Sequence, residues 1–388
     1  MLKNQDKFSN EIIYHILIDR FSEYDSSKNW KEPIFCGGTL KGIKKKIPYL
    51  KNLGITTIWI SPFYKTNAYH GYHITDFFLV DPHFGSDSDL KVLIEKIHEN
   101  EMKIIADFVP NHCSKYHPFF IDAQQNKKSP YQRWFYFTKW PNEYLSFLSF
   151  PEIPKLNLDN QETYEYILNA AKHWMSFGLD GFRLDHVIGP SYKFWKRFTR
   201  EIKKQNQQFL LIGEAWMAGI KYHELKTINM KRKRLLWFFG ANSDRLLRLY
   251  INYLDGVLDF NAQQLILKNI ALHSKRTISN LLHKHYKKFP SSFILPLFLD
   301  NHDMDRFLFS CNNNVKLLQK AAEIQFSINQ PVIIYYGTEI GMSQEKSIWC
   351  NSAHGDILAR EPMRWNEINH EVLLFYQQLC QKHNHKSK

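Results

Sequence analysis

Four short segments of this chain place a carboxylate where a run of strand-forming residues ends. They are DFVPNH at 107–112, GFRLDHV at 181–187, GEAW at 213–216 and FLDNHD at 298–303. A charged residue directly after an apolar strand carries a desolvation cost unless its side chain faces an opening. Four such endings therefore predict one polar pocket at the carboxyl edge of a parallel sheet, and this pocket is the expected active site.

Eight candidate strands alternate with helical patterns along the chain. The strands, rich in β-branched and aromatic residues, are expected at 12–18, 55–61, 103–109, 179–185, 209–215, 256–261, 292–299 and 331–337. Apolar residues recur at helical spacing between them, as from Leu90 to Ile97 after the candidate caps Ser86 and Asp87. This alternation predicts parallel pairing and a closed (β/α)8 barrel. A doubly wound open sheet is the alternative, but no glycine-rich phosphate turn follows the first strand.

The strand-end carboxylates differ in their expected surroundings. Arg183 and Asp185 share a face of their strand, so the guanidinium is expected to lower the pKa of Asp185 and keep it ionised. An ionised carboxylate suits a nucleophile, and a structural ion pair is the alternative. Burial of Glu214 would raise its pKa and suit a general acid. Asp303, beside His302, is suited to steadying positive charge, and glycoside cleavage needs one carboxylic acid and one carboxylate.

The four segments, in this order and with these intervals, resemble the α-amylase family of retaining glycoside hydrolases over nearly the whole chain. Three further segments match, namely GYHITDF at 71–77, YYGTEIGM at 335–342 and REPMRW at 360–365. The family has a (β/α)8 barrel, so the resemblance supports the predicted fold.

The resemblance also implies a role for each candidate residue. Asp185 would be the nucleophile, Glu214 the acid/base and Asp303 the transition-state stabiliser. The residues that would hold the sugar in the cleavage subsite are Arg183, His112 and His302, with Tyr72 stacked on its ring.

The connection from 110 to 159 is too long for an ordinary loop and predicts a subdomain inserted after the third strand. The catalytic barrel would then comprise 1–109 and 160–388. The insertion is dense in aromatic residues, which are expected to form its core, with the alternative that some offer flat faces to a sugar ring. HPFFIDA at 117–123, SPYQRWFYF at 129–137 and IPKLN at 153–157 resemble the neopullulanase and cyclomaltodextrinase branch.

This branch implies a hydrolase that cleaves α-1,4-glucosidic bonds of maltodextrins, cyclodextrins or starch through a covalent glycosyl-aspartate. LDNHDMDRF at 299–307 is instead similar to cyclodextrin glucanotransferases. A 4-α-glucanotransferase or cyclodextrin glucanotransferase is therefore the alternative, because transfer uses the same covalent intermediate. A catalytically inactive binding barrel is a third possibility, and the presence of all three carboxylates speaks against it.

The chain departs from the family pattern where many members bind calcium. That site uses the asparagine that corresponds to Asn111 and an aspartate where this chain has Lys155. An ammonium group cannot ligate a cation, so we expect no metal site there and no required cofactor. The N-terminal module of the branch and the usual C-terminal β domain are also expected to be absent. The barrel surfaces left exposed predict either self-association into a homo-oligomer or modest stability.

Composition narrows the partners and the compartment. The formal charge of +13 could indicate an anionic partner, but the densest basic run, 231–234, precedes LLWFFG and fits the polar part of a helix. We therefore expect no nucleic acid. No apolar run approaches the ~20 residues of a membrane span, and the polar N-terminus does not resemble a signal peptide. Five scattered cysteines without CxxC pairing favour reduced thiols and the cytoplasm.

Overall fold

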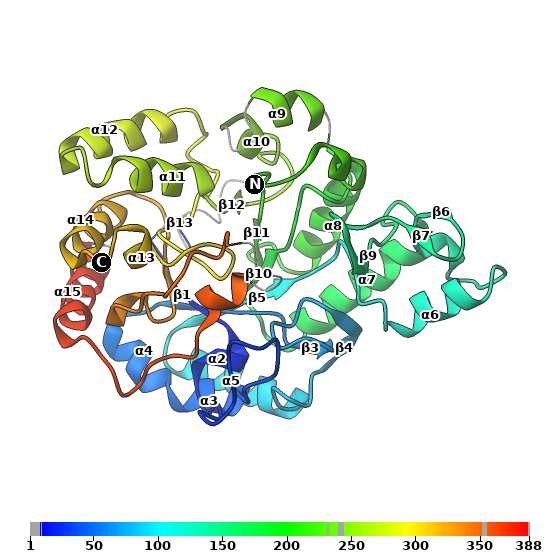
Figure 1. The fold of residues 1–388 in the computed structure, drawn as a ribbon, viewed down its shortest axis with the longest axis horizontal. Coiled ribbons are helices and arrows are strands. Elements are labelled where there is room, and N and C mark those ends of the chain that lie inside the picture. The colour runs from blue at the N-terminus through cyan, green and yellow to red at the C-terminus, as the bar shows by residue number, and fades with distance from the viewer. Residues whose placement is uncertain (1–7, 9, 231–232, 240–243, 351–354, 387–388) are drawn as a thin grey trace.

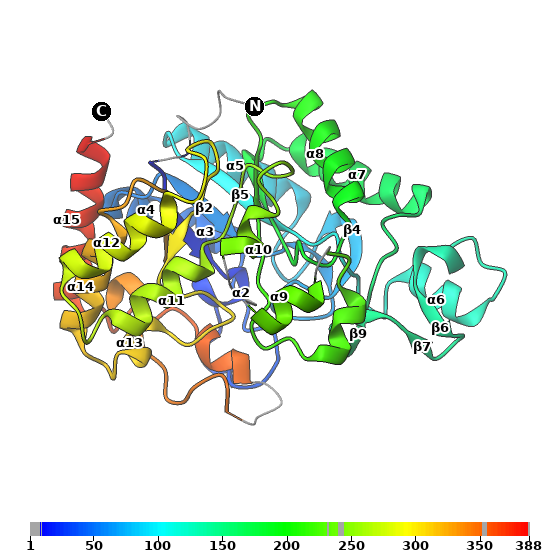
Figure 2. The same ribbon diagram turned by 90° about the horizontal axis from the view of Figure 1, so that it is seen from above.

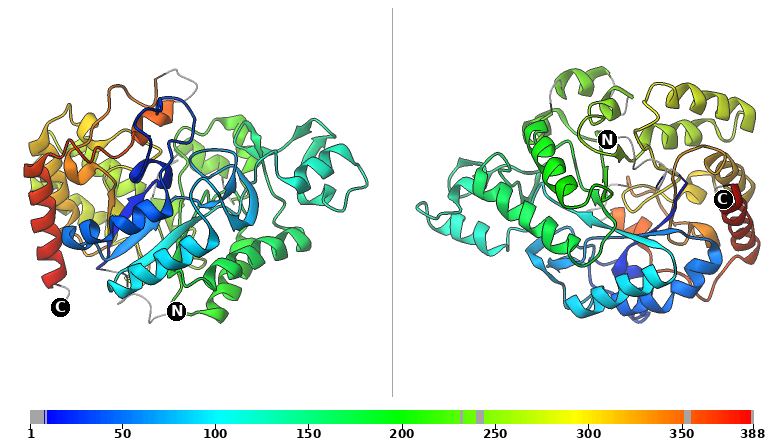
Figure 3. Two further views of the ribbon diagram at one scale, coloured as in Figure 1. Left: turned by 90° about the horizontal axis from the view of Figure 1, so that it is seen from below. Right: turned by 180° about the vertical axis from the view of Figure 1, so that it is seen from behind.

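A sheet of eight parallel strands, surrounded by helices, forms the centre of the molecule (Figures 1 and 3). The computed structural model describes residues 8, 10–230, 233–239, 244–350 and 355–386. The strands of the sheet are β1 (Ile12–Ile16), β2 (Thr57–Ile60), β5 (Lys103–Phe108), β10 (Gly181–Leu184), β11 (Leu210–Gly213), β12 (Gly256–Val257), β13 (Leu297–Phe298) and β14 (Val332–Tyr335). Each lies inside a predicted strand.

The sheet closes on itself. β1 pairs with both β2 and β14, so neither β1 nor β14 is an edge at that point. Between β12 and β13 the closure is a parallel bridge from Gly256 to Ile294. The Val257 amide donates to the Ile294 carbonyl at 3.1 Å, and the Ile294 amide donates to the Asp255 carbonyl at 2.9 Å. The predicted (β/α)8 barrel is confirmed, and the open-sheet alternative is wrong.

The helices that cover the barrel follow from local caps and apolar spacing. They are α2 (Ile18–Phe21), α3 (Leu40–Lys45), α4 (Ile47–Leu53), α5 (Asp87–Glu99), α7 (Gln161–Met175), α8 (Tyr192–Gln205), α9 (Lys233–Phe239), α10 (Asp244–Arg248), α11 (Phe260–Asn269), α12 (Lys275–Tyr286), α13 (Phe307–Ser310), α14 (Val315–Gln325) and α15 (His370–Lys386). The predicted cap Ser86 starts α5 by a capping box with Asp89. Of the basic run, Lys233 and Arg234 begin α9, whereas 231–232 lie outside the described residues.

One predicted strand is too long. We expected strand structure to continue to residue 261, but β12 ends at Val257 and α11 begins at Phe260. The Asp259 side chain accepts a hydrogen bond from the Ala262 amide at 2.9 Å and so caps the helix. Aspartate at this position stabilises a helix start, which outweighs the β propensity of the apolar residues around it.

A hairpin of β3 (Tyr64–Thr66) and β4 (Ile74–Val80) was not predicted. It follows β2 and holds Tyr72 in its turn. Gly71 there has φ +86, and a Cβ atom would lie 2.1 Å from the Pro62 carbonyl oxygen. The GYHITDF segment therefore needs glycine for the close approach that places Tyr72 above the strand ends.

The chain between β5 and α7 protrudes from the side of the barrel (Figures 1 and 2). It contains α6 (Pro118–Gln125), the 3-10 helix η1 (Gln132–Trp134), β6 (Phe137–Lys139), β7 (Glu143–Tyr144), β8 (Ser146–Phe147) and β9 (Phe150–Pro154). Its aromatic rings pack on one another, as in the stacked pair Phe119 and Tyr131 at 3.9 Å. This segment corresponds to the expected insertion, and the exact domain boundaries stay a prediction.

Apolar side chains fill the inside of the barrel. Ile13, Trp59, Ile105, Ile212 and Ile333 belong to one buried cluster drawn from five of the strands. A filled interior is typical of such barrels and leaves room for a ligand only above the strand ends.

A buried ion-pair cluster joins three helices of the outer wall. His285 of α12 contacts Asp244 of α10 through Nδ1 and Asp259, the cap of α11, through Nε2, both at 2.8 Å. Burial lowers the pKa of His285, but its hydrogen bonds to the two carboxylates outweigh burial and raise the pKa to about 9.

Candidate active site

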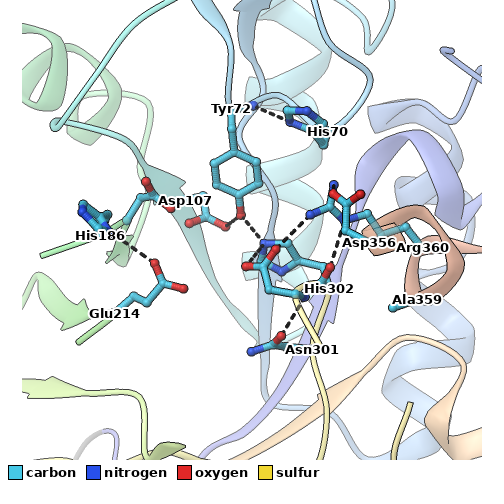
Figure 4. A network of polar contacts seen from close by, with 12 residues as sticks. His70, Tyr72, Asp107, His186, Glu214, Asn301, His302, Asp356, Ala359 and Arg360 are labelled. Carbon is cyan, nitrogen blue, oxygen red and sulfur yellow. Dashed lines mark hydrogen bonds and ion pairs between the residues drawn. The ribbon is translucent and has the colours of Figure 1, made fainter. Parts of the chain in front are cut away.

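The four strand-end segments meet at one cavity. The cavity has a volume of about 500 Å³ and is lined by the three candidate catalytic carboxylates, Asp185, Glu214 and Asp303. The candidate sugar-binding residues Tyr72, His112 and His302 also line it. Arg183 lies beneath the cavity and is 1% exposed. All seven residues selected from the sequence are therefore brought together (Figure 4 draws part of the group).

Arg183 forms ion pairs with three carboxyl groups of the site. Its Nη1 donates to Asp107 Oδ1 at 2.6 Å and to Asp185 Oδ1 at 2.9 Å, and its Nη2 lies 2.7 Å from Glu214 Oε1. One guanidinium thus contacts a carboxylate from each of three neighbouring strands, β5, β10 and β11. Asp107 is fixed further by the Trp59 indole, which donates to Oδ2 at 3.0 Å.

The prediction that Asp185 has a lowered pKa is wrong. Burial raises the pKa of Asp185 well above its usual value, and this outweighs the lowering effect of Arg183, while Glu214 and Asp107 add to the rise. Burial likewise raises the pKa of Glu214, in the predicted direction. The Asp185–Glu214 pair therefore holds a proton to a higher pH than isolated carboxyl groups do.

Asp303 behaves in the opposite way. Burial raises its pKa, but the charges of His302 and Arg360 outweigh burial and hold the pKa well below its usual range. The contacts are His302 Nε2 to Asp303 Oδ2 at 3.0 Å and Arg360 Nη2 to Oδ1 at 2.9 Å. Asp303 therefore stays ionised.

Tyr72 connects Asp107, which is bound to Arg183, with His302, which is bound to Asp303. Its hydroxyl donates to Asp107 Oδ2 at 3.1 Å and lies 2.8 Å from His302 Nε2, as Figure 4 shows. Its ring is parallel to that of His302 within 12°. The tyrosine is thus held by polar contacts at its tip, which fixes the orientation of a flat ring at the cavity wall.

A model of the α-amylase catalytic domain matches residues 15–372. The chain belongs to the α-amylase family. Relatives of this family member include alpha-amylase 2 of Dictyoglomus thermophilum, 36% identical over 378 residues (95% of this chain and 62% of the relative), and neopullulanase 2 of Thermoactinomyces vulgaris, 30% identical over 394 residues (95% and 61%). The chain therefore spans about three fifths of the length of these curated relatives.

A solved structure agrees with this assignment. The α-amylase of Geobacillus thermoleovorans, determined in complex with acarbose, superposes with a TM-score of 0.79 at 28% identity, covering 97% of this chain and 79% of that one. No helix among the described residues of the present α-amylase-family chain has the length and apolar character to cross a membrane.

The residues where many α-amylase-family members bind calcium do not fit the ion here. The Lys155 ammonium, 2% exposed, donates to Asn111 Oδ1 at 3.3 Å, Gly189 O at 2.7 Å and Thr227 O at 2.5 Å. These are oxygen atoms of the kind that ligate calcium, and a calcium ion would have to displace the ammonium to reach them. Lys155 thus connects the protruding segment to the barrel through these three hydrogen bonds, and burial lowers the pKa of its ammonium group to about 7.

Several cavity residues were missed by the sequence reasoning. Arg360 belongs to the quoted REPMRW segment, yet nothing in that pattern indicated its ion pairs with Asp303 and, at 2.7 Å, with Asp356. Trp216 lies two residues after Glu214, a spacing that could have indicated a shared face.

His186 was also missed, although it follows Asp185 directly. It adopts φ +45, which is uncommon for a residue with a side chain. Its amide donates to Glu214 Oε2 at 3.0 Å (Figure 4), so the unusual backbone directs an N–H group at the candidate acid. Its Nε2 atom is buried without a hydrogen-bond partner among the described residues, and burial lowers the pKa of the ring well below its usual value. The neutral ring lines the cavity.

Proposed function

We propose that this chain is a retaining α-glucan hydrolase that cleaves α-1,4-glucosidic bonds of maltodextrins, cyclodextrins or starch. The observation that carries the proposal is the position of Asp185 and Glu214 on one guanidinium, 2.9 and 2.7 Å from Arg183, in a cavity that Asp303 also lines. A pair of carboxyl groups flanking one bond is what glycoside cleavage requires. The names of the relatives, alpha-amylase and neopullulanase, support the substrate class.

The reaction proceeds in two displacements. The Asp185 carboxylate attacks C1 of the sugar while the Glu214 carboxyl gives its proton to the glycosidic oxygen, so the bond to the leaving sugar breaks and a glycosyl ester forms on Asp185. Glu214, now a carboxylate, then takes a proton from water, whose oxygen bonds to C1 and frees Asp185. Two inversions retain the configuration. Asp303 stabilises the positive charge at C1 in both steps.

The charge balance around Arg183 supports this assignment. One guanidinium faces three carboxyl groups, from Asp107, Asp185 and Glu214. Full ionisation of all three would leave excess negative charge in a buried site, and burial raises the pKa of both Asp185 and Glu214. The pair therefore holds a proton to a higher pH than isolated carboxyls do, and the first step needs this proton on Glu214 and the negative charge on Asp185.

A 4-α-glucanotransferase or cyclodextrin glucanotransferase is the second candidate. It differs only in that a sugar hydroxyl, in place of water, attacks the glycosyl ester. Aromatic side chains around Glu214 favour it, because Trp216, Phe147 and Phe150 line the cavity and offer surface to an acceptor sugar. Product lengths at high maltodextrin concentration separate the two candidates.

We further propose that the enzyme requires no calcium or other cofactor and acts in the cytoplasm. The Lys155 contacts support calcium independence. The compartment is supported by Cys36, Cys113, Cys311 and Cys380, which are buried thiols outside any disulfide.

The test is to incubate the protein with starch, maltotriose, γ-cyclodextrin and pullulan and to identify the products. We expect the wild type to release short maltodextrins and Asp185→Asn to release none, since an amide cannot form the glycosyl ester. Asp25→Asn, at an exposed carboxylate outside the cavity, is the matched control and should keep full activity. A wild type that cleaves none of the four glucans refutes the proposed function.

A further inference from the structure

The loop that follows β14 is tied to the loop that follows β13. Asp305 Oδ1 accepts hydrogen bonds from Gln344 Nε2 at 2.6 Å and from the Ile348 amide at 2.7 Å, and its Oδ2 accepts from Ser347 Oγ at 2.6 Å. The Arg306 amide donates back to Gln344 Oε1 at 2.7 Å. Two residues after the candidate stabiliser Asp303, one carboxylate thus fixes the path of the loop from 344 to 348.

This loop presents Trp349 to the active-site cavity. Ile348 and Trp349 both line it, and the Trp349 side chain is 61% exposed. Trp349 is the exposed tryptophan of the described residues, in contrast to Trp59, Trp174 and Trp195, which are buried. An exposed indole at a cavity leaves apolar surface in water, and a ligand that covers this surface gains the free energy of its burial.

The neighbours of Trp349 locate it relative to the carboxylates. Its ring lies edge-to-face on Trp216, with centroids 6.4 Å apart and planes at 64°. Trp216 in turn stacks on Phe260 at 4.9 Å and 4°, which fixes the ring that Trp349 contacts. Trp216 follows Glu214 by two residues, and Glu214 is the proposed proton donor to the leaving oxygen. Trp349 therefore lies beside the strand end that carries the proposed proton donor.

We propose that Trp349 is the stacking platform for a glucosyl unit on the leaving-group side and that Asp305 is its positioning residue, an inference that rests on the proposed function. The C–H face of a pyranose is apolar and carries partial positive charge, so it packs on the negative face of an indole. The same platform receives the incoming sugar in transfer. There the acceptor hydroxyl bonds to C1, the ester bond to Asp185 breaks, and the hydroxyl proton goes to Glu214.

The test compares two substrates that share the glycosyl part and differ in the leaving group. Maltotriose places a sugar on the leaving-group side, whereas α-maltosyl fluoride loses only fluoride. We expect Trp349→Ala to lower kcat/KM for maltotriose by about tenfold, because the stacked ring is lost, and to leave hydrolysis of the fluoride unchanged. Trp349→Phe, which keeps a flat ring, should retain most of the maltotriose activity.

Two further variants complete the design. Asp305→Ala should lower the ratio of maltotriose to fluoride activity and the share of transfer products, a pattern that general destabilisation does not produce. Tyr116→Ala, at a residue that is 55% exposed and outside the cavity, should change neither. Equal losses on both substrates in Trp349→Ala and Trp349→Phe, or no loss in either, overturn the inference while the proposed function stands. A wild type inactive on both substrates refutes the function and the inference together.

Discussion

Replacing His285 by glutamine should remove a pH-dependent part of the stability of the barrel wall. His285 is 5% exposed and its two ring nitrogens contact Asp244 and Asp259 at 2.8 Å each. Its pKa is raised from 6.5 to about 9 in the folded chain. At about 1.4 kcal/mol per pKa unit, this difference corresponds to about 3 kcal/mol of stabilisation when the ring is protonated.

The sign of the pH dependence follows from the raised pKa. Below about pH 6.5 the ring is charged in both the folded and the unfolded chain, and the full contribution is present. As the pH rises through about 9, the folded chain also loses the proton and the contribution disappears. Glutamine, like the neutral imidazole ring, donates from one nitrogen only, so the variant stands in for the uncharged state of His285.

Chemical denaturation at several pH values measures the effect. We expect His285→Gln to be less stable than the wild type by about 3 kcal/mol at pH 6 and by less than about 1 kcal/mol at pH 10. His283→Gln, an exposed histidine of the same helix, is the control and should follow the wild type. Parallel stability curves for the wild type and His285→Gln from pH 6 to 10 would show that a charged His285 ring does not stabilise the folded chain.

Three other predictions concern the site. Glu214→Gln should still form the glycosyl ester from α-maltosyl fluoride, because fluoride leaves without a proton, but the ester should then be hydrolysed slowly. Mass spectrometry of Asp185-containing peptides should detect the ester, and rapid turnover of the fluoride would contradict the acid/base role. Arg183→Met should lower the free energy of unfolding by roughly 3–5 kcal/mol at pH 7, because the buried carboxylates lose their cation. A loss under about 1 kcal/mol would contradict the stabilising role of these ion pairs. A chelator should change neither activity nor melting temperature, since Lys155 fills the oxygen cluster, and a rise in melting temperature with added calcium would refute this.

The sequence predicted the barrel because its strands are buried on both sides and therefore read as continuous apolar runs. The shortest strands of the barrel sheet, β12 and β13, were predicted in the right place but with the wrong ends. Asp259 starts the helix that follows β12 through a side-chain hydrogen bond, which a pattern of apolar residues does not reveal. The β3–β4 hairpin was missed because its turn depends on the contact of Gly71 with Pro62, nine residues earlier.

In the candidate site, too, the sequence predicted some features and missed others. Residues on the strand ends were found because each segment carries its own carboxylate. The predicted direction of the Asp185 pKa was wrong because Asp185 is buried in the assembled barrel, where Glu214 and Asp107 from other strands add to the rise. Trp349 was not found, since its place beside Trp216 depends on Asp305, more than forty residues away. The proposed self-association stays a prediction.

The ion pairs of Arg183 with three carboxyl groups affect how the pH optimum can be engineered. Since Asp107, Asp185 and Glu214 share one guanidinium, a substitution at any of them changes the charge that the other two experience. The pH optimum of such an enzyme cannot be shifted by adjusting the acid alone, because the nucleophile would shift with it. Variants at these positions are expected to combine non-additively, and a library that varies them jointly should contain pH profiles that no series of single substitutions reaches.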